Sequence, residues 1–340
     1  MRFSGREISG KTDMLVAMSH PRIISLVPSA TETVFELGLG AALVGRSHVC
    51  NFPPEALSVP ILTQPQVATE SSRTIHDDVR QRLAAGLAIY ALDLDQIRSL
   101  EPTHLLVQDQ CSVCAVSPGD LESALADWLG DRPTLVRLAP HTLADVWRDI
   151  ETVGLALDRA EAARSLRTKL SFRLSDLVES IGFIEDRPRV ASVEWLAPLM
   201  IAGHWVPELV RLAGGEPLLA QSGGPSRTVD LDTLERSRPD VIVIQACGFD
   251  RSQTRREWND RPELGTAFRG WQNRRGEPVR VALVDGDAYF NRPGPRLVDS
   301  AELLAEILHS DRPRVYEGRG WESLIEGASP LPRAKTHAMD

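Results

Sequence analysis

Four cysteines offer the most specific chemistry in this sequence, and two of them lie close together. Cys111 and Cys114 stand three positions apart in "QDQCSVCAVS", whereas Cys50 and Cys247 are remote single residues. Four thiolates match the ligand number of a tetrahedral zinc site or a cubane iron–sulfur cluster. A second C-x-x-C pair is missing, however, and free cysteines also serve as small buried side chains. Three uses therefore stay open: a metal or cluster site, separate core thiols, and a redox pair.

Three histidines form a second group of candidate ligands. His48, His141 and His204 each follow an apolar run that we expect to be a strand. A neutral imidazole is a good metal ligand, but a histidine in a loop also serves as an ordinary hydrogen-bonding group. His204 is the strongest candidate, because it stands beside a tryptophan and ahead of a segment in which a proline begins a helix.

Aromatic side chains are scarce, at 5% of the chain, so their positions are informative. Trp205, Tyr289 and Phe290 follow predicted strands and would present flat surfaces to a large planar ligand. Asn291 and Arg292 come directly after them and would supply polar contacts. We expect one of Tyr289 and Phe290 to pack into the core beneath this loop.

The elements that must position these residues alternate along the chain. Short β-branched runs bounded by turn residues are separated by segments of helical periodicity, as in "RIISLVPS", "THLLVQ", "RVASVEWL" and "DVIVIQA". This alternation predicts an α/β fold with mostly parallel sheets. In such sheets ligands bind beyond the carboxyl ends of the strands. The cysteines, the three histidines and the aromatic candidates all fall at such ends.

An internal repeat predicts two lobes of related structure. The segments 92–111 and 229–248 match at an offset of 137 residues, and each reads as an aspartate N-cap, a short helix, a proline and a buried strand. Apolar residues at helical spacing predict a long backbone helix between the lobes, with Gly154 as a possible break. We expect a flexible leader (1–20), an N-terminal α/β lobe (21–141), a linking helix (142–183), a C-terminal α/β lobe (184–311) and a flexible tail (312–340).

Composition and charge narrow the classes of function. The net charge of −9 is spread along the chain without a basic block, which argues against a nucleic-acid partner and favours a small-molecule ligand. We find no secretory signal and no segment long and apolar enough to insert in a membrane, so we expect a cytoplasmic protein. The common catalytic and nucleotide-binding motifs are absent, so we expect a binding protein rather than an enzyme.

Four segments, taken in order, resemble a known family. "RIISLVPSATETVFELGL", "LVGRSHVCNFPPEA", "LAGGEPLL" and "DAYFNRPGPR" resemble the helical-backbone (class III) substrate-binding proteins of ABC importers, particularly the cobalamin-binding branch, here without a signal peptide. The resemblance implies two α/β lobes joined by a backbone helix, with a ligand cleft between them. It also gives the aromatic residues of "DAYF" a place that faces the ligand.

The same resemblance implies a docking role for Asp95 and Asp232. In the family a glutamate on each lobe docks onto arginines of an ABC permease, and these aspartates match those positions. An acid in the first turn of a helix is also favoured by the helix dipole without any partner. Docking and simple helix stabilisation both remain open.

Two functions fit the sequence. The first is a cytoplasmic corrinoid-binding protein whose ligand, by resemblance, is cobalamin rather than heme or a siderophore. The second is a metalloprotein that holds an iron–sulfur cluster or zinc through the four cysteines. The thiols and the aromatic residues could also serve side by side.

Overall fold

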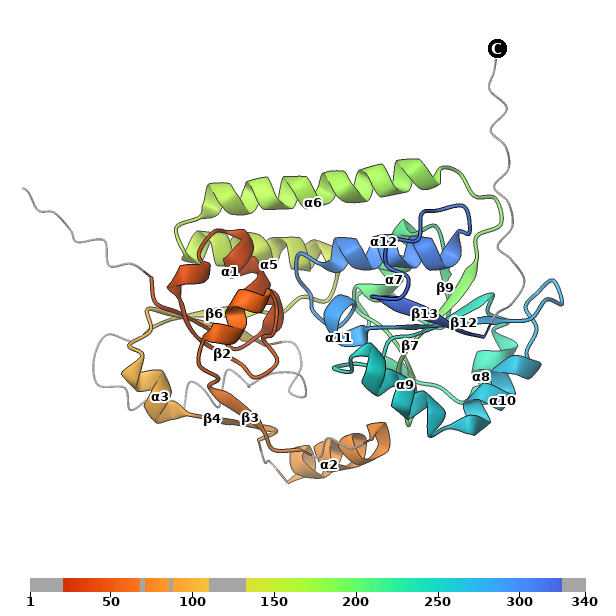
Figure 1. Ribbon diagram of the computed structural model, residues 1–340, viewed down its shortest axis with the longest axis horizontal. Helices are drawn as coiled ribbons and strands as arrows, with labels where there is room; N and C mark the ends of the chain where they lie inside the picture. Colours follow the sequence, from red (N-terminus) through yellow and green to blue (C-terminus); the bar gives the residue numbers. More distant parts are fainter. Residues whose placement is uncertain (1–20, 68–70, 86–87, 110–132, 326–340) are drawn as a thin grey trace, which may run out of the picture.

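The computed structural model describes residues 21–67, 71–85, 88–109 and 133–325 of the chain. They form two α/β lobes that lie side by side, with one long helix running along both (Figure 1). The expected fold class, two lobes with mostly parallel sheets joined by a backbone helix, is therefore confirmed.

The first lobe is built on a parallel sheet with the strand order β2-β1-β5-β6. Its strands are β1 (Ile23–Ser25), β2 (Leu43–Arg46), β5 (His104–Gln108) and β6 (Thr134–Leu138). Its helices are α1 (Pro28–Glu36), α2 (Ser72–Ala84) and α3 (Leu94–Ser99), with 3₁₀ turns η1 (Gly40–Ala42) and η2 (Pro54–Ser58). A separate antiparallel ladder pairs β3 (Thr63–Pro65) with β4 (Tyr90–Leu92) outside this sheet. The central strands are buried along their length, as expected for a parallel sheet covered on both faces.

The second lobe has a mixed sheet with the order β10-β8-β7-β11-β12-β13, and β9 pairs with β7 beside this path. Its strands are β7 (Arg189–Leu196), β8 (Leu199–Ile201), β9 (Glu216–Pro217), β10 (Arg227–Thr228), β11 (Val241–Ile244), β12 (Arg280–Val284) and β13 (Trp321–Ile325). Its helices are α7 (Val206–Leu212), α8 (Leu231–Arg236), α9 (Arg251–Asn259), α10 (Pro262–Gly270), α11 (Gly286–Tyr289) and α12 (Leu297–Leu308). The central strands β7, β11 and β12 are parallel, which brings their carboxyl ends to one edge.

The linking region is a pair of helices, where we expected one helix over 142–183. α5 (Leu143–Ala156) and α6 (Ala160–Ile181) are separated by a turn in which Asp158 has a left-handed φ of 56°. The two helices approach closely because Gly154 has no side chain: a Cβ at that position would lie 2.3 Å from the Cβ of Ala163. Gly154 thus marks a helix contact, and the chain turns four residues later.

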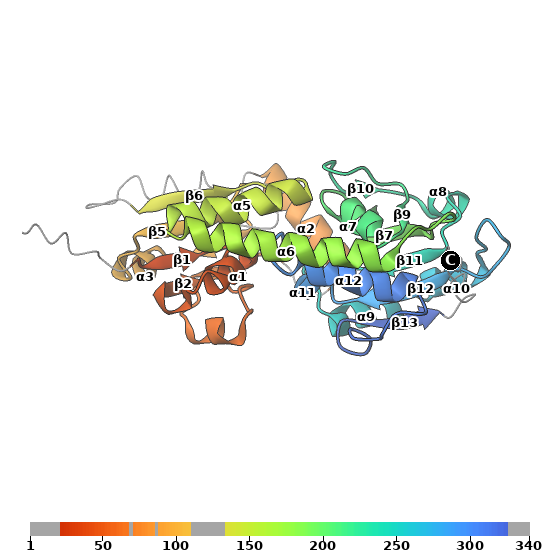
Figure 2. The same cartoon turned by 90° about the horizontal axis from the view of Figure 1, so that it is seen from above.

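α6 is the helix that joins the two lobes. Its 22 residues give it a length of about 33 Å, and Figure 2 shows it lying along both lobes. One stripe of the helix is buried at intervals of three and four residues: Ala163, Leu166, Leu170, Leu174, Leu177 and Ile181. This stripe packs on α5, which lies over the first lobe, and on α7 and α12 of the second lobe. Arg173 adds ion pairs to Asp299 (2.7 Å) and Glu302 (2.8 Å) of α12.

One apolar core is continuous through both lobes. It includes Ile23 and Leu106 of the first sheet, Leu170 of α6, and Val243 and Leu304 of the second lobe. Wide separation of the lobes would expose part of this core to water, which is unfavourable in proportion to the apolar area exposed. The shared core therefore restricts hinge motion between the lobes.

The segment after residue 312, which we expected to be a flexible tail, is ordered as far as Ile325. β13 pairs antiparallel with β12, and the Nε1 of Trp321 donates a hydrogen bond to Glu306 Oε2 at 3.0 Å. The sequence of β13, "WESLI", does not alternate between apolar and polar residues and so does not reveal the strand. The leader (1–20) and residues 326–340 lie outside the described residues.

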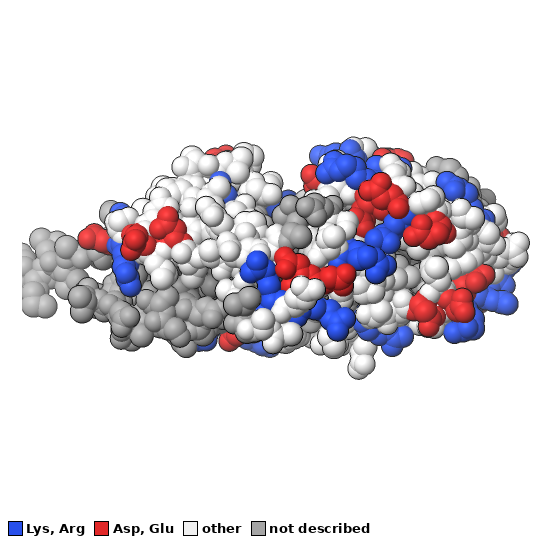
Figure 3. All heavy atoms as spheres, turned by 90° about the horizontal axis from the view of Figure 1, so that it is seen from below, with Lys and Arg blue, Asp and Glu red and all other residues white. Residues whose placement is uncertain are grey.

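The surface opposite α6 carries mixed charge. In Figure 3 acidic and basic side chains alternate across the middle of the molecule and over the second lobe, without a broad area of one sign among the residues drawn in colour. Within the described ranges, no helix is both long and apolar enough to cross a membrane.

Candidate ligand-binding site between the lobes

The carboxyl edges of the two sheets face each other. His141, which follows β6 of the first lobe, lies beside His204 of the second lobe, with ring centroids 5.5 Å apart. Nearby, the backbone N–H of Leu143 at the start of α5 donates a hydrogen bond to Glu208 Oε2 of α7 at 2.7 Å. Two of the three predicted histidines thus meet at the boundary between the lobes.

The local backbone fixes His204 in this position. Its φ is 51°, a left-handed value that histidine adopts more readily than most residues. Its N–H donates to Gly224 O (2.6 Å) and its carbonyl accepts from Gly223 N–H (2.9 Å). Burial lowers the pKa of the half-buried His204 ring, and the neighbouring His141 lowers it further.

We expect this imidazole to make the protein less stable in mild acid. The folded protein favours the neutral ring. The free energy of unfolding is therefore unaffected by this ring above the ordinary pKa of 6.5 and falls below it, because there the unfolded chain takes up a proton more readily. Urea unfolding at pH 7.5 and 5.5 would show a smaller loss of stability for His204→Asn, since asparagine tolerates the left-handed backbone. An equal loss in the variant and the parent would exclude His204 as a source of the pH dependence.

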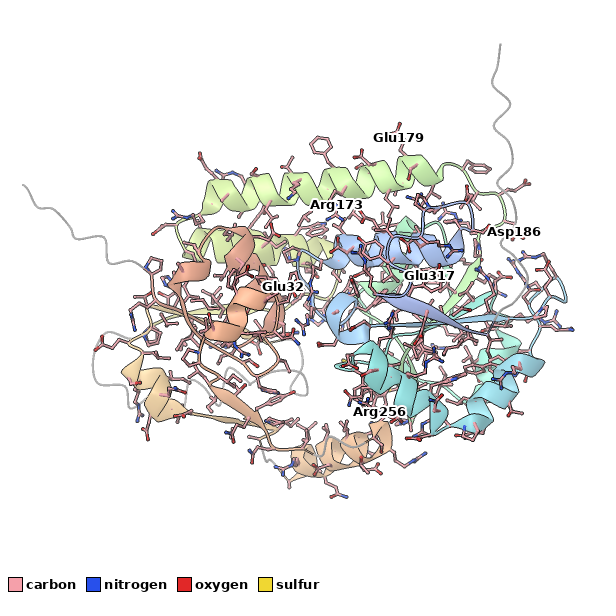
Figure 4. The ribbon with its side chains drawn as sticks, viewed as in Figure 1. Glu32, Arg173, Glu179, Asp186, Arg256 and Glu317 are labelled. Atoms are coloured by element: carbon pink, nitrogen blue, oxygen red, sulfur yellow. The ribbon has the colours of Figure 1, made fainter. Side chains whose placement is uncertain are left out.

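A cluster of buried charges joins α1 to the second lobe. Glu32 Oε1 accepts a hydrogen bond from Arg296 Nη2 at 2.6 Å and lies 3.6 Å from Arg292 Nη1. Arg292 also bonds to Asp287 at 2.5 Å. Figure 4 shows Glu32 on α1 where the first lobe meets the second. Burial raises the pKa of Glu32, although both arginines oppose the rise.

This cluster changes the expected role of Arg292. We expected a polar contact to the ligand, but its side chain is buried and bonded within the protein. A guanidinium in this setting helps to hold the lobes together, because it lies between Glu32 of the first lobe and Asp287 of the second; its removal would take the bonded arginine from Asp287 and leave Glu32 with Arg296 alone. Arg296, which the sequence analysis did not select, shares that task and also covers the ring of Phe52 at 3.9 Å from its centroid.

Two of the predicted aromatic residues belong to the core. Phe290 is fully buried, and Trp205 is 6% exposed. The Nε1 of Trp205 donates a hydrogen bond to the carbonyl of Phe290 at 2.9 Å. Tyr289 is half-buried and packs edge-on against Tyr316, with centroids 5.9 Å apart. Trp205 and Phe290 therefore pack in the core beneath the loop. For Phe290 this agrees with the expectation that one of Tyr289 and Phe290 is a core residue; for Trp205 it differs from the expected ligand contact.

Four other rings lie near the carboxyl edges: His48, Tyr90 and Trp195 are half-buried, whereas Phe249 is buried. In the first lobe the His48 ring lies 5.4 Å from that of Tyr90, and its Nδ1 is 2.7 Å from Thr63 Oγ1. In the second lobe Trp195 at the end of β7 lies 5.3 Å from Phe249, which follows β11. Close by, Asn291 Oδ1 accepts a hydrogen bond from Gly248 N–H at 3.3 Å.

Sequence reasoning missed Tyr90, Trp195 and Phe249. Trp195 stands at the end of the predicted strand "RVASVEWL", so a search that included the last strand residue would have found it. Phe249 follows Cys247 by two positions in the loop after β11, and Tyr90 lies on the separate ladder.

The cysteines do not form a common site among the described residues. Cys50 is fully buried, its Sγ lies 3.6 Å from Ser25 O, and burial raises its pKa to about 11, so it is a core thiol. Cys247 is half-buried in the second lobe. Cys111 and Cys114 lie outside the described residues. Within the described ranges, no group of three or more metal-binding side chains occurs. The part of the chain that the structure describes therefore gives no support to a zinc or iron–sulfur site.

The repeat in the sequence corresponds to a repeat in the structure. Asp93 caps α3 by accepting from Gln96 N–H at 2.9 Å, and Asp230 caps α8 by accepting from Thr233 N–H at 2.6 Å. Asp95 and Asp232 each stand two residues after the capping aspartate, in the first turn of the helix. Both are exposed, one on each lobe. Figure 1 shows α3 and α8 far apart on the side of the molecule opposite α6.

Two α/β lobes on one backbone helix, with ring-bearing side chains at facing sheet edges, define a two-lobed binding protein. Comparison of sequences identifies its family: a model of the periplasmic binding protein family matches residues 23–265, and the chain belongs to that family. It is thus a substrate-binding protein of the type that serves ABC transporters, as the resemblance in the sequence implied.

Alignments with individual relatives cover most of this chain and most of each relative. The vitamin B12-binding protein of Vibrio cholerae serotype O1 is 25% identical over 300 residues, which are 87% of this chain and 93% of the relative. The crystal structure of the periplasmic vitamin B12 binding protein BtuF of Vibrio cholerae matches with a TM-score of 0.55 at 21% identity, over 84% of this chain and 95% of that one. A periplasmic heme binding protein from Pseudomonas aeruginosa gives 0.63 at 17% identity, over 92% and 99%.

These comparisons correct one expectation. We expected a cytoplasmic protein, but the family is one of periplasmic binding proteins, and the two solved structures named above are described as periplasmic. The cytoplasmic assignment is therefore wrong.

Proposed function

We propose that this protein captures cobalamin between its two lobes and presents it to an ABC permease. The observation that carries the proposal is the similarity to vitamin B12-binding proteins over nearly the whole chain. The half-buried rings of His48, Tyr90 and Trp195 near the facing edges support it. His48 and Tyr90 in one lobe, and Trp195 in the other, would pack against a large flat ligand through apolar area and stacking, while the buried Phe249 supports the ring of Trp195.

Polar groups at the same edges suit the periphery of such a ligand. The half-buried Asn291 carries an amide NH₂ group that can donate to an acceptor, while its Oδ1 is used by Gly248. His204 and His141 add imidazoles at the junction of the lobes. Of the ligand residues proposed from the sequence, His48, His204, Tyr289 and Asn291 thus retain this role as a proposal, whereas Trp205, Phe290 and Arg292 act by supporting them.

Heme is the second candidate ligand. It is favoured by the structural likeness to several heme-binding proteins, of which one from Roseiflexus sp. RS-1 gives a TM-score of 0.60 at 20% identity. His48 and Tyr90 lie together in the first lobe, and imidazole and phenolate are both known axial ligands of heme iron. Both ligands are flat tetrapyrrole-type macrocycles, so one surface of rings would suit either.

Titration of the purified protein with cyanocobalamin and with hemin, followed by absorbance, tests the proposal. We expect saturable one-to-one binding of cyanocobalamin and weaker binding of hemin. Tyr90→Ala removes a ring from the first-lobe wall and should weaken cyanocobalamin binding by about tenfold or more. Phe172→Ala is the control, because Phe172 is 64% exposed on α6. Stronger binding of hemin than of cyanocobalamin would show that heme is the preferred ligand. Binding of neither compound would refute the proposed function.

Docking onto a permease through Asp95 and Asp232 remains a prediction. Both carboxylates are exposed and lie on equivalent helices of the two lobes, so two basic sites on a permease dimer could receive them together. Exchange of both for lysine should abolish stimulation of the permease ATPase in proteoliposomes while ligand affinity stays unchanged. Asp176→Lys on the exposed side of α6 is the matched control, and equal stimulation by all variants would exclude this docking mode.

A further inference from the structure

A segment of the first lobe reaches across to the second lobe on the side opposite α6. We name it the α2 strap: the β3–β4 ladder together with α2. Figure 1 shows α2 below the junction of the lobes, while α5, α6 and α12 lie above it. α2 also contacts β7 of the second lobe. The strap is therefore a connection between the lobes that is separate from the backbone helix.

The contact depends on one serine, Ser72, in the first turn of α2. Its N–H donates to Glu257 Oε2 at 3.1 Å, and its hydroxyl donates to Glu257 Oε1. Its carbonyl accepts a hydrogen bond from Trp195 Nε1 at 3.1 Å. Ser72 is 1% exposed, and all three of its polar groups are bonded by side chains of the second lobe. We call this contact the Ser72 latch.

Glu257 is held in place for this contact. It is buried on α9, and Arg261 Nε donates to its Oε1 at 3.1 Å. Its carboxylate lies at the amino end of the 13-residue helix α2, where the helix dipole favours negative charge. The first turn of α2 is independently completed by a capping box between Ser71 and Thr74. Glu257 therefore accepts a hydrogen bond from the Ser72 N–H, which the capping box of α2 does not use.

The rest of α2 is weakly attached. Ser72 and Val79 are its buried residues, whereas α6 and α12 bury a full stripe or more. An element with few buried apolar contacts opens locally at low cost in free energy. The lobes themselves share a continuous core and the Glu32 cluster, so they resist separation. Movement is easier for the strap than for either lobe.

We propose that the α2 strap is a gate over the ligand site, and that the Ser72 latch holds it closed. The proposal rests on the proposed function, namely that a ligand binds between the lobes. Opening breaks the three hydrogen bonds of Ser72 and frees the indole of Trp195, which belongs to the proposed ring surface of the second lobe. Ligand exchange would thus require release of the latch while the backbone helix stays fixed.

The latch can be tested without ligand by hydrogen–deuterium exchange of peptides from α2. Ser72→Ala removes the hydroxyl bond, and Glu257→Gln removes the charge while keeping the shape. Each should speed exchange across α2 by about tenfold, because Ser72→Ala removes a hydrogen bond to a charged group and Glu257→Gln replaces a charged acceptor with a neutral one. Glu263→Gln is the matched control, since Glu263 is exposed and lies 3.9 Å from the same Arg261. Unchanged exchange in both latch variants would overturn the proposal.

Stopped-flow binding of cyanocobalamin, or of hemin if the parent protein prefers it, then tests the gate. We expect both latch variants to raise the association and dissociation rates together, by about fivefold or more, with a smaller change in Kd. Faster α2 exchange with unchanged binding rates would show that the strap opens but is no gate. If the parent protein binds neither compound, the gate falls with the proposed function, while the exchange experiment still decides whether the latch exists.

Discussion

Glu32→Ala is expected to lower the free energy of unfolding by about 3–5 kcal/mol, because it leaves buried positive charge without its partner. Arg296 donates to Glu32 at 2.6 Å, and Arg292 lies 3.6 Å away with a buried side chain. After the substitution Arg292 retains Asp287, but Arg296 loses the carboxylate to which it is bonded. The charged guanidinium of Arg296 must then be accommodated in a largely dehydrated place.

Glu36→Ala provides the control for this experiment. Glu36 is the last residue of the same helix, α1, and is exposed. It should change stability by less than about 0.5 kcal/mol, as surface substitutions usually do. Chemical denaturation of the three proteins measures the difference. Similar values for Glu32→Ala and Glu36→Ala would show that the cluster does not stabilise the junction of the lobes.

Trp205→Ala should have an effect of similar size, about 3–5 kcal/mol, through the loss of a large core side chain. Trp205 is 6% exposed and packs in the core that both lobes share. Its indole also donates to Phe290 O, which ties α7 to the loop after α11. Trp205→Phe keeps most of the packing and loses this hydrogen bond, so it should cost only about 1 kcal/mol.

The pair of variants separates a core role from a ligand-binding role. If Trp205 supports the fold, Trp205→Phe should bind cyanocobalamin with nearly the affinity of the parent protein, and the loss in Trp205→Ala should appear in thermal and chemical denaturation. A ligand contact would give the reverse pattern, with unfolding midpoints unchanged and affinity reduced. Phe172→Ala again controls for removal of an exposed aromatic side chain.

The features predicted correctly from the sequence are those with local signals. The two aspartate caps, Asp93 and Asp230, each bond the N–H three residues ahead, as the repeat indicated. The break between α5 and α6 was placed only approximately, near Gly154, because its turn residue Asp158 is neither glycine nor proline. β13 was missed for another reason: its five residues do not alternate between apolar and polar, and its pairing with β12 is visible only in the folded chain.

The candidate site shows the same limit at the level of side chains. The rule that ligands lie at the carboxyl ends of parallel strands selected His141 and His204, whose rings lie side by side, although His204 and Trp205 follow β8, which is antiparallel to β7. It could not tell that Trp205 points into the core while Trp195, on β7, is half-buried beside α2. The Ser72–Glu257 contact joins residues 185 positions apart, so only the folded chain reveals it.

The apolar stripe of α6 has a consequence for biosynthesis. α6 ends at Ile181, but α12, which covers part of its stripe, begins only at Leu297. At ordinary rates of translation, α6 would leave the ribosome on the order of ten seconds before that partner exists. During this interval the leucines that later join the lobes are exposed to other chains. The same helix that gives the finished protein its rigidity therefore makes the nascent chain dependent on protection from aggregation.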